Sequence, residues 1–278
     1  MPHETTAVDH ADDAYDVKGR PGPGDAAEAG RHGRILGVLD RLLYDQGFRS
    51  AFAAEGPGGM RPPLDADLIE VFDRVDLTEL RLVGRNIRSA VVSGGTGTGQ
   101  GLKGAFARTL ETIRERHGHG TNEVAELFLA SPQFQHFRDV PYSPRGRGLS
   151  LPECFHRFMA AGPSFDPECA LEPLAHHEAA CAVARAIATG AEATFDVTLR
   201  DSAFHGGTFC AFRDYSEAPA DWDLRPTMFL AGAGRCVIGP AGRPLFDALT
   251  SVLAGHDVGT PPDVRAKLLQ RLRTWGLR

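Results

Sequence analysis

The stretch "ATFDVTLRDSAFHGGTFCAFRDY", residues 193–215, decides the fold class of this chain. Upstream of it, apolar residues recur at helical spacing. Within it, Phe195, Val197 and Leu199 alternate with polar residues, which is the period of a strand. Further strands are predicted at "GTFCAFRDY", "TMFLAG" and "CVIGP". The pattern therefore predicts an α+β protein in which helices come first and a small sheet follows.

Amphipathic patterns and capping residues predict the helices. A break near Asp76–Glu79 is expected because Asp76 or Thr78 can cap a new helix, and Ser150 and Glu153 form a capping box. Residues 132–148, rich in Pro and Gly at their end, are expected to be irregular. The predicted helices cover residues 33–52, 65–92, 105–116, 122–131, 153–161, 171–190, 243–255 and 264–277.

Three segments follow from these patterns. Residues 1–32 hold few large apolar side chains and many Asp, Gly, Pro and Ala, so we expect a disordered leader there. Residues 33–188 form a predicted helical domain, and residues 189–278 form a predicted α+β domain.

Composition and charge argue against nucleic-acid-binding, membrane and secreted proteins. The net charge of −6 and the pI near 6.0 argue against nucleic acid as a partner, and no apolar run is long enough for a membrane helix. The N-terminus lacks the basic start and apolar core of a signal peptide. The 5 cysteines form no Cys-x-x-Cys pair, so a reduced, cytoplasmic protein is expected.

The glycine-rich segment "VSGGTGTGQGLKGAF", residues 92–106, contains the dinucleotide-binding pattern Gly-x-Gly-x-x-Gly. That site also needs a strand before the glycines, whereas "SAVV" continues a helical period. A flexible joint over Gly94–Gly104 is therefore the favoured interpretation, and a phosphate-binding turn is the alternative.

Histidines and arginines offer weaker candidates for chemistry. His117 and His119 flank a glycine, and His176 and His177 are adjacent on a helix, which points them in different directions. Neither pair has the further ligands of a metal site, so solvated or core histidines are favoured. Arg145 and Arg147 could bind an anion from a loop. No catalytic, cofactor-binding or metal-binding residue is therefore assigned in this chain.

The order of elements adds a resemblance. The segments "LDRLLYDQGFRSAF", "VAELFLASPQFQHF" and "LSLPECFHRFMAA", with the pattern of residues 228–278 closing on "WGLR", resemble the partner proteins of multinuclear non-haem iron oxidative enzymes. Those enzymes modify ribosomally made peptides, as in methanobactin-type and thioglutamate-type pathways. The resemblance covers most of residues 34–278.

The resemblance implies a non-catalytic subunit that presents a precursor peptide to the iron oxidase, with the iron held by the partner. The second domain would be a winged-helix-like peptide-recognition element, in which the peptide pairs with an edge strand within Thr227–Gly239 and packs on the last helix. The candidate peptide-binding residues are Met228, Phe229, Leu230, Leu268, Leu272 and Trp275.

Two alternatives remain open at the level of sequence. The last helix carries Arg265, Lys267, Arg271 and Arg273, which suits a winged-helix transcriptional regulator with a helical sensing domain. The second alternative is an enzyme whose site in the helical domain follows no recognised motif.

Overall fold

A computed structural model describes residues 23–95, 99–139, 150–191, 199, 202–205, 207–232, 234–256 and 261–277. Contacts divide the chain into two units, Met1–Leu39 and Asp40–Arg278. The described part of the first unit belongs to helix α1 (Pro23–Tyr44), which begins before the predicted start at residue 33. The alanines and glutamate of "GDAAEAG" are strong helix formers, and Pro is tolerated in a first turn. The rest of the predicted leader lies outside the described residues.

The helix predicted over residues 33–52 is broken at Asp45. The Asp45 side chain accepts a hydrogen bond from the Phe48 amide at 2.9 Å, which ends α1 and starts α2. The predicted break at Asp76 is confirmed, because its carboxylate accepts from the Thr78 and Glu79 amides. The helices that follow α1 are α2 (Gln46–Glu55), α3 (Ala66–Phe72), α4 (Leu77–Ser93), α5 (Leu102–Ala105), α6 (Ala107–His117), α7 (Thr121–Leu129), α8 (Pro132–Asp139), α9 (Leu151–Ala160) and α10 (Glu172–Ala186).

Helix α8 corrects the prediction of an irregular segment. Ser131 accepts a hydrogen bond from the Phe134 amide at 3.2 Å, and the Phe134 side chain is buried among other aromatic rings. This cap and this burial stabilise a helix that the polar composition did not reveal. Arg145 and Arg147 lie outside the described residues. The capping box of Ser150 and Glu153 at the start of α9 is confirmed.

The glycine segment contains two short strands that pair with each other. Strands β1 (Gly94–Gly95) and β2 (Gly99–Gln100) pair antiparallel, and α5 follows at once. The segment "SAVV" before it belongs to α4, so the strand of a dinucleotide-binding turn is not found at that position. A Cβ on Gly101 would overlap the backbone of Gly94, so only glycine fits there.

The C-terminal part contains a four-stranded antiparallel meander. Its strands are β3 (Ser202–His205), β4 (Thr208–Arg213), β5 (Thr227–Gly232) and β6 (Arg235–Pro240), in that order across the sheet. Helices α11 (Arg243–Ala254) and α12 (Pro262–Thr274) complete the described chain. The strand predicted over residues 193–199 lies outside the described residues except for Leu199.

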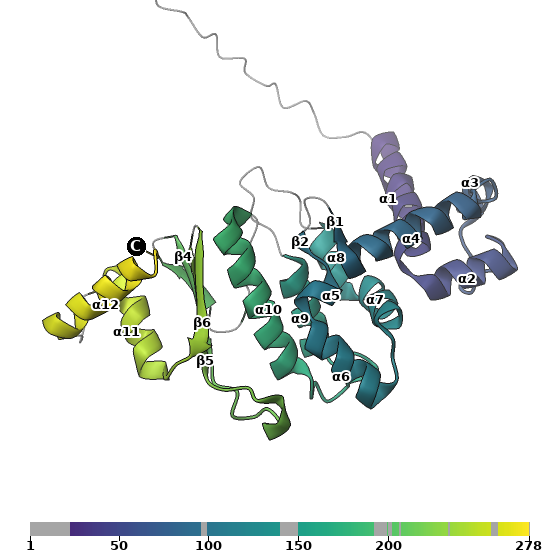
Figure 1. Ribbon diagram of the computed structural model, residues 1–278. Coiled ribbons are helices and arrows are strands. Elements are labelled where there is room, and N and C mark those ends of the chain that lie inside the picture. The colour runs from purple at the N-terminus through teal and green to yellow at the C-terminus, as the bar shows by residue number, and fades with distance from the viewer. Residues whose placement is uncertain are drawn as a thin grey trace, which may run out of the picture. The chain divides into compact units, whose positions relative to one another are not determined.

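The two faces of the sheet pack against different helices, as Figure 1 shows. Phe209, Phe229 and Ala231 belong to a core that also contains α10 and the other helices around it. Cys210, Met228 and Leu230 belong to a second core with α11 and α12. Strand alternation places these residues on opposite faces. Residues on both sides of the predicted boundary at 188 therefore share one core.

The chain is thus an α+β protein, with a helical part and one small antiparallel sheet of four strands among the described residues. A short π-helical turn, η1 (Ile187–Ala191), follows α10, and its Ala188 carbonyl accepts from the Gly234 amide at the β5–β6 turn. In the described ranges no helix combines the length and the apolar character that crossing a membrane requires.

Candidate functional site

An apolar groove lies between strand β6 and helices α11 and α12, and we call it the sheet groove. Its volume is about 190 Å³. Met228 and Leu249 are buried lining residues, and Arg271 gives the groove one cation. The residues lining the sheet groove are Met228, Val237, Gly239, Pro240, Ala241, Leu245, Leu249, Leu268, Arg271 and Trp275.

The structure brings three of the six candidate peptide-binding residues together in this groove, namely Met228, Leu268 and Trp275. Leu230 and Leu272 are fully buried in the core beneath it. Phe229 is also fully buried but packs on the opposite face of the sheet, 5.6 Å from the His177 ring. In this arrangement Phe229 is a core residue and cannot line the same pocket as Met228.

Strand β6 is an edge of the sheet, and among the described residues no further strand pairs with its outer side. The Ala241 amide donates to the Pro226 carbonyl, and in the same register Gly239 and Val237 lie opposite Met228 and Leu230. Hydrogen-bonded and non-hydrogen-bonded pairs alternate in an antiparallel ladder. The backbone groups of Val237 and Gly239 therefore point toward β5, and those of Cys236 and Ile238 point outward.

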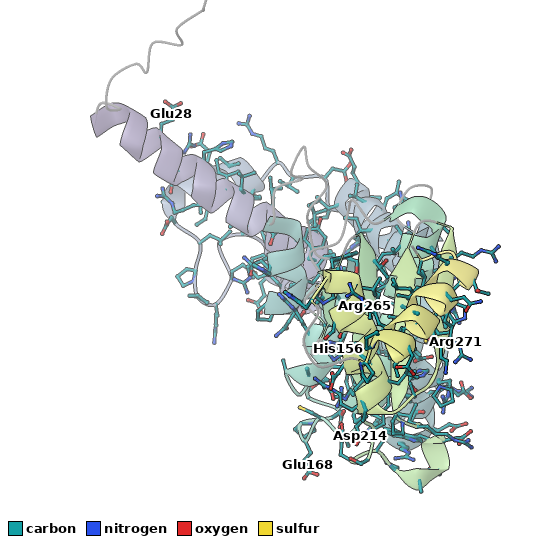
Figure 2. The ribbon with its side chains drawn as sticks, turned by 90° about the vertical axis from the view of Figure 1, so that its left-hand side faces the viewer. Glu28, His156, Glu168, Asp214, Arg265 and Arg271 are labelled. Atoms are coloured by element: carbon teal, nitrogen blue, oxygen red, sulfur yellow. The ribbon has the colours of Figure 1, made fainter. Side chains whose placement is uncertain are left out.

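The surroundings of the groove combine apolar and basic character. Leu245 and Val264 are 39% and 38% exposed, so large apolar side chains stand in water on α11 and α12. Arg271, labelled on α12 in Figure 2, lies over the Trp275 ring with its guanidinium carbon 5.6 Å from the ring centroid. A ligand here would meet apolar surface, one guanidinium and the outer backbone edge of β6.

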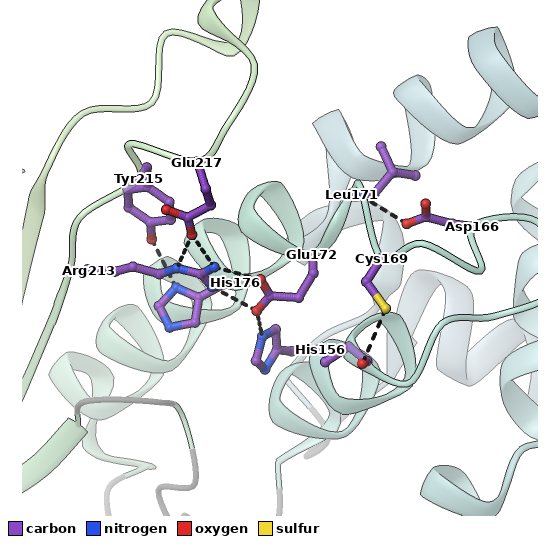
Figure 3. Close-up of polar contacts among 10 residues, drawn as sticks. His156, Asp166, Cys169, Leu171, Glu172, His176, Arg213, Tyr215 and Glu217 are labelled. Carbon is purple, nitrogen blue, oxygen red and sulfur yellow. Dashed lines mark hydrogen bonds and ion pairs between the residues drawn. The ribbon is translucent and has the colours of Figure 1, made fainter.

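A second arrangement of polar side chains lies between α9, α10 and the end of β4 (Figure 3). Arg213 forms a two-pronged pair with Glu172, with nitrogen–oxygen distances of 2.7 and 2.6 Å. The His156 ring nitrogen lies 2.7 Å from the same carboxylate. We call this set the polar cluster, and its members are His156, Glu172, His176, Arg213, Tyr215 and Glu217.

Burial and neighbouring charges shift the pKa values of the polar cluster, and for Glu172 they act in opposite directions. Burial alone raises the pKa of Glu172, but hydrogen bonds from His156 and Arg213 and the Arg213 charge hold this pKa well below its usual range. Burial raises the pKa of the Tyr215 hydroxyl, which lies 2.9 Å from Nδ1 of His176. Glu172 is therefore a carboxylate and Tyr215 a neutral phenol at neutral pH.

The polar cluster suits a structural role better than catalysis. His176 is fully buried, and Arg213 and Tyr215 are nearly so, which keeps substrates away from them. His177 points toward the Tyr215 and Phe229 rings, and burial, followed by the charges of Arg108 and Arg185, lowers its pKa to about 4. Within the ranges that the structure describes, no group of three His, Cys, Asp or Glu side chains could hold a metal ion.

Burial also raises the pKa of three of the five cysteine thiols substantially. Burial raises the pKa of the Cys154 and Cys210 thiols to about 12, and that of Cys181 to about 11. These three side chains therefore remain protonated at neutral pH and act as small apolar groups in the core. All five cysteines are free thiols in this structure.

The sequence pattern revealed neither the polar cluster nor a cleft rich in arginine between α2 and α4. The cluster joins residues from 156 to 217, and no local motif connects them. One sequence feature indicated the cleft, since Arg81, Arg85 and Arg88 fall on one helical face.

No family model, curated protein or solved structure matches this chain.

Proposed function

We propose that this chain is a non-catalytic partner protein, which binds a precursor peptide in the sheet groove and presents it to a multinuclear non-haem iron oxidase. The observation that carries the proposal is the edge position of β6 beside an apolar groove. An extended peptide can add a strand at such an edge, with backbone bonds giving affinity and side-chain pockets giving specificity.

The groove is arranged for a strand that lies beside β6. Outward backbone groups of Cys236 and Ile238 would bond the peptide, while its alternate side chains would face Val237 and Trp275. The β5–β6 hairpin and α12 together form the winged-helix-like recognition element of the proposal. The oxidase as partner, with its iron, rests on the resemblance of sequence pattern alone.

A proline in the edge strand tests peptide binding. Cys236 lies opposite Ala231 in a non-hydrogen-bonded pair, so Cys236→Pro removes an outward donor and leaves the ladder to β5 intact. We expect the affinity for a fluorescently labelled precursor peptide to fall several-fold, up to about tenfold, since one lost hydrogen bond contributes roughly 0.5–1.5 kcal/mol. The measurement is fluorescence anisotropy.

Cys236→Ala is the matched control, because it removes the same thiol and keeps the amide. Equal affinity in the Pro and Ala variants would contradict strand addition at β6. The regulator alternative predicts a different outcome with promoter DNA: tight, sequence-dependent binding that falls steeply with salt and depends on Arg271 and Arg273. DNA binding of that kind without peptide affinity would replace the proposal.

A further inference from the structure

A cleft between α2 and α4 gathers four arginines in a protein whose net charge is −6. Its volume is about 400 Å³, within the usual range of small-molecule sites. Three of the arginines follow one face of α4, and the fourth comes from α2. We call it the arginine cleft, and it is lined by Gln46, Arg49, Ser50, Thr78, Arg81, Arg85 and Arg88.

The inner arginines of the cleft are already held in place. Arg49 donates to the Leu42 and Leu43 carbonyls at 2.8 and 3.0 Å, which fixes its guanidinium at the end of α1. Arg88 pairs with the Glu126 carboxylate, and Arg49 lies 3.9 Å from the same group. Glu126 therefore offsets one positive charge at the base of the cleft and orients two guanidinium groups.

The outer arginines have no such partner. Among the described residues, Arg81 and Arg85 make no hydrogen bond or ion pair with the protein. Like charges four residues apart repel one another on a helix, so this spacing carries a cost when no anion is bound. The nearby acids Asp45 and Asp76 are engaged with helix amides at the starts of α2 and α4.

We propose that the arginine cleft binds a phosphate group of a small molecule. Guanidinium groups match phosphate oxygens with two parallel hydrogen bonds, and Arg81 and Arg85 both have their donors available. Ser50, Thr78 and Gln46 add neutral donors on the walls. Four arginines and one glutamate leave the cleft with an excess of positive charge that a di- or triphosphate would neutralise.

Calorimetric titration of the full chain with pyrophosphate at fixed ionic strength tests this site. We expect saturable binding that weakens at least tenfold in the double variant Arg81→Gln/Arg85→Gln. The variant Arg81→Lys/Arg85→Lys should bind several-fold more weakly than the native chain, because lysine keeps the charge but loses the planar fork. Thermal unfolding of each variant checks that it is folded.

The matched control Arg74→Gln/Lys267→Gln removes the same charge outside the cleft and should bind pyrophosphate like the native chain. Equal weakening by the control would show that only overall charge matters and would overturn the site. Equally tight binding of citrate would overturn the assignment to phosphate. No pyrophosphate binding, with salt-sensitive binding of a DNA duplex instead, would assign the cleft to a macromolecule.

Discussion

At the scale of single residues, Glu172 connects side chains of two other elements, His156 on α9 and Arg213 on β4. It accepts two hydrogen bonds from Arg213 and lies 2.7 Å from the His156 ring nitrogen, in a partly buried region. Removing one partner of a buried ion pair leaves the other charge without compensation, which costs more than the pair itself contributes. Glu172 therefore holds α9, α10 and the end of β4 together.

Glu172→Gln should destabilise the fold by about 2–4 kcal/mol, because the amide keeps the volume but leaves Arg213 with Glu217 as its remaining carboxylate. Urea unfolding measures the change. Asp223→Asn is the control, since its pair with Arg225 is exposed and should contribute under ~1 kcal/mol. A similar decrease in the free energy of unfolding in both variants would show that the Glu172–Arg213 pair stabilises the fold no more than an exposed pair.

At the scale of elements, the β1–β2 hairpin depends on close backbone contact. A Cβ on Gly101 would overlap Gly94 and the end of α4, whereas a Cβ on Gly104 would make ordinary contacts with the Gln100 side chain, the nearest at 3.4 Å. The two glycines thus differ although both belong to the same sequence pattern. Close packing therefore requires glycine at position 101 but not at position 104.

Gly101→Ala should therefore lower the stability by about 1–3 kcal/mol through overpacking. Gly104→Ala lies in α5 and should be neutral or stabilising by up to ~1 kcal/mol, as expected for alanine in a helix. Thermal unfolding of the two variants makes the comparison. An unchanged midpoint for Gly101→Ala would rule out the close contact.

At the scale of the whole molecule, stability should depend on pH through buried groups. The pKa of His177 is lowered to about 4 in the fold, so the unfolded chain binds the proton more tightly and stability falls as the pH drops from ~6.5 toward 4. The pKa of Glu172 is also lowered, so its contribution is present above the ordinary carboxyl pKa and is lost on further acidification.

Urea midpoints between pH 4.5 and 7.5 test the histidine part of this expectation. His177→Gln should flatten the decline between ~6.5 and 4.5, because the variant has no proton to gain on unfolding at this position. His119→Gln is the control, since its side chain is 40% exposed and lies at the protein surface 3.6 Å from the Glu123 carboxylate. A decline of equal slope in the native chain and in His177→Gln would assign the pH dependence to other groups.

The sequence by itself determined the features that depend on near neighbours. Helix starts at Asp76 and Ser150 follow from caps that act within three residues, and the alternation of Met228, Phe229 and Leu230 follows from the strand period. Only the tertiary structure decided which face of the sheet receives α10 and which receives α11 and α12, and hence that Phe229 lies away from the sheet groove. The polar cluster, the arginine cleft and the edge position of β6 likewise unite distant segments, because packing across the fold, rather than local preference, fixes them.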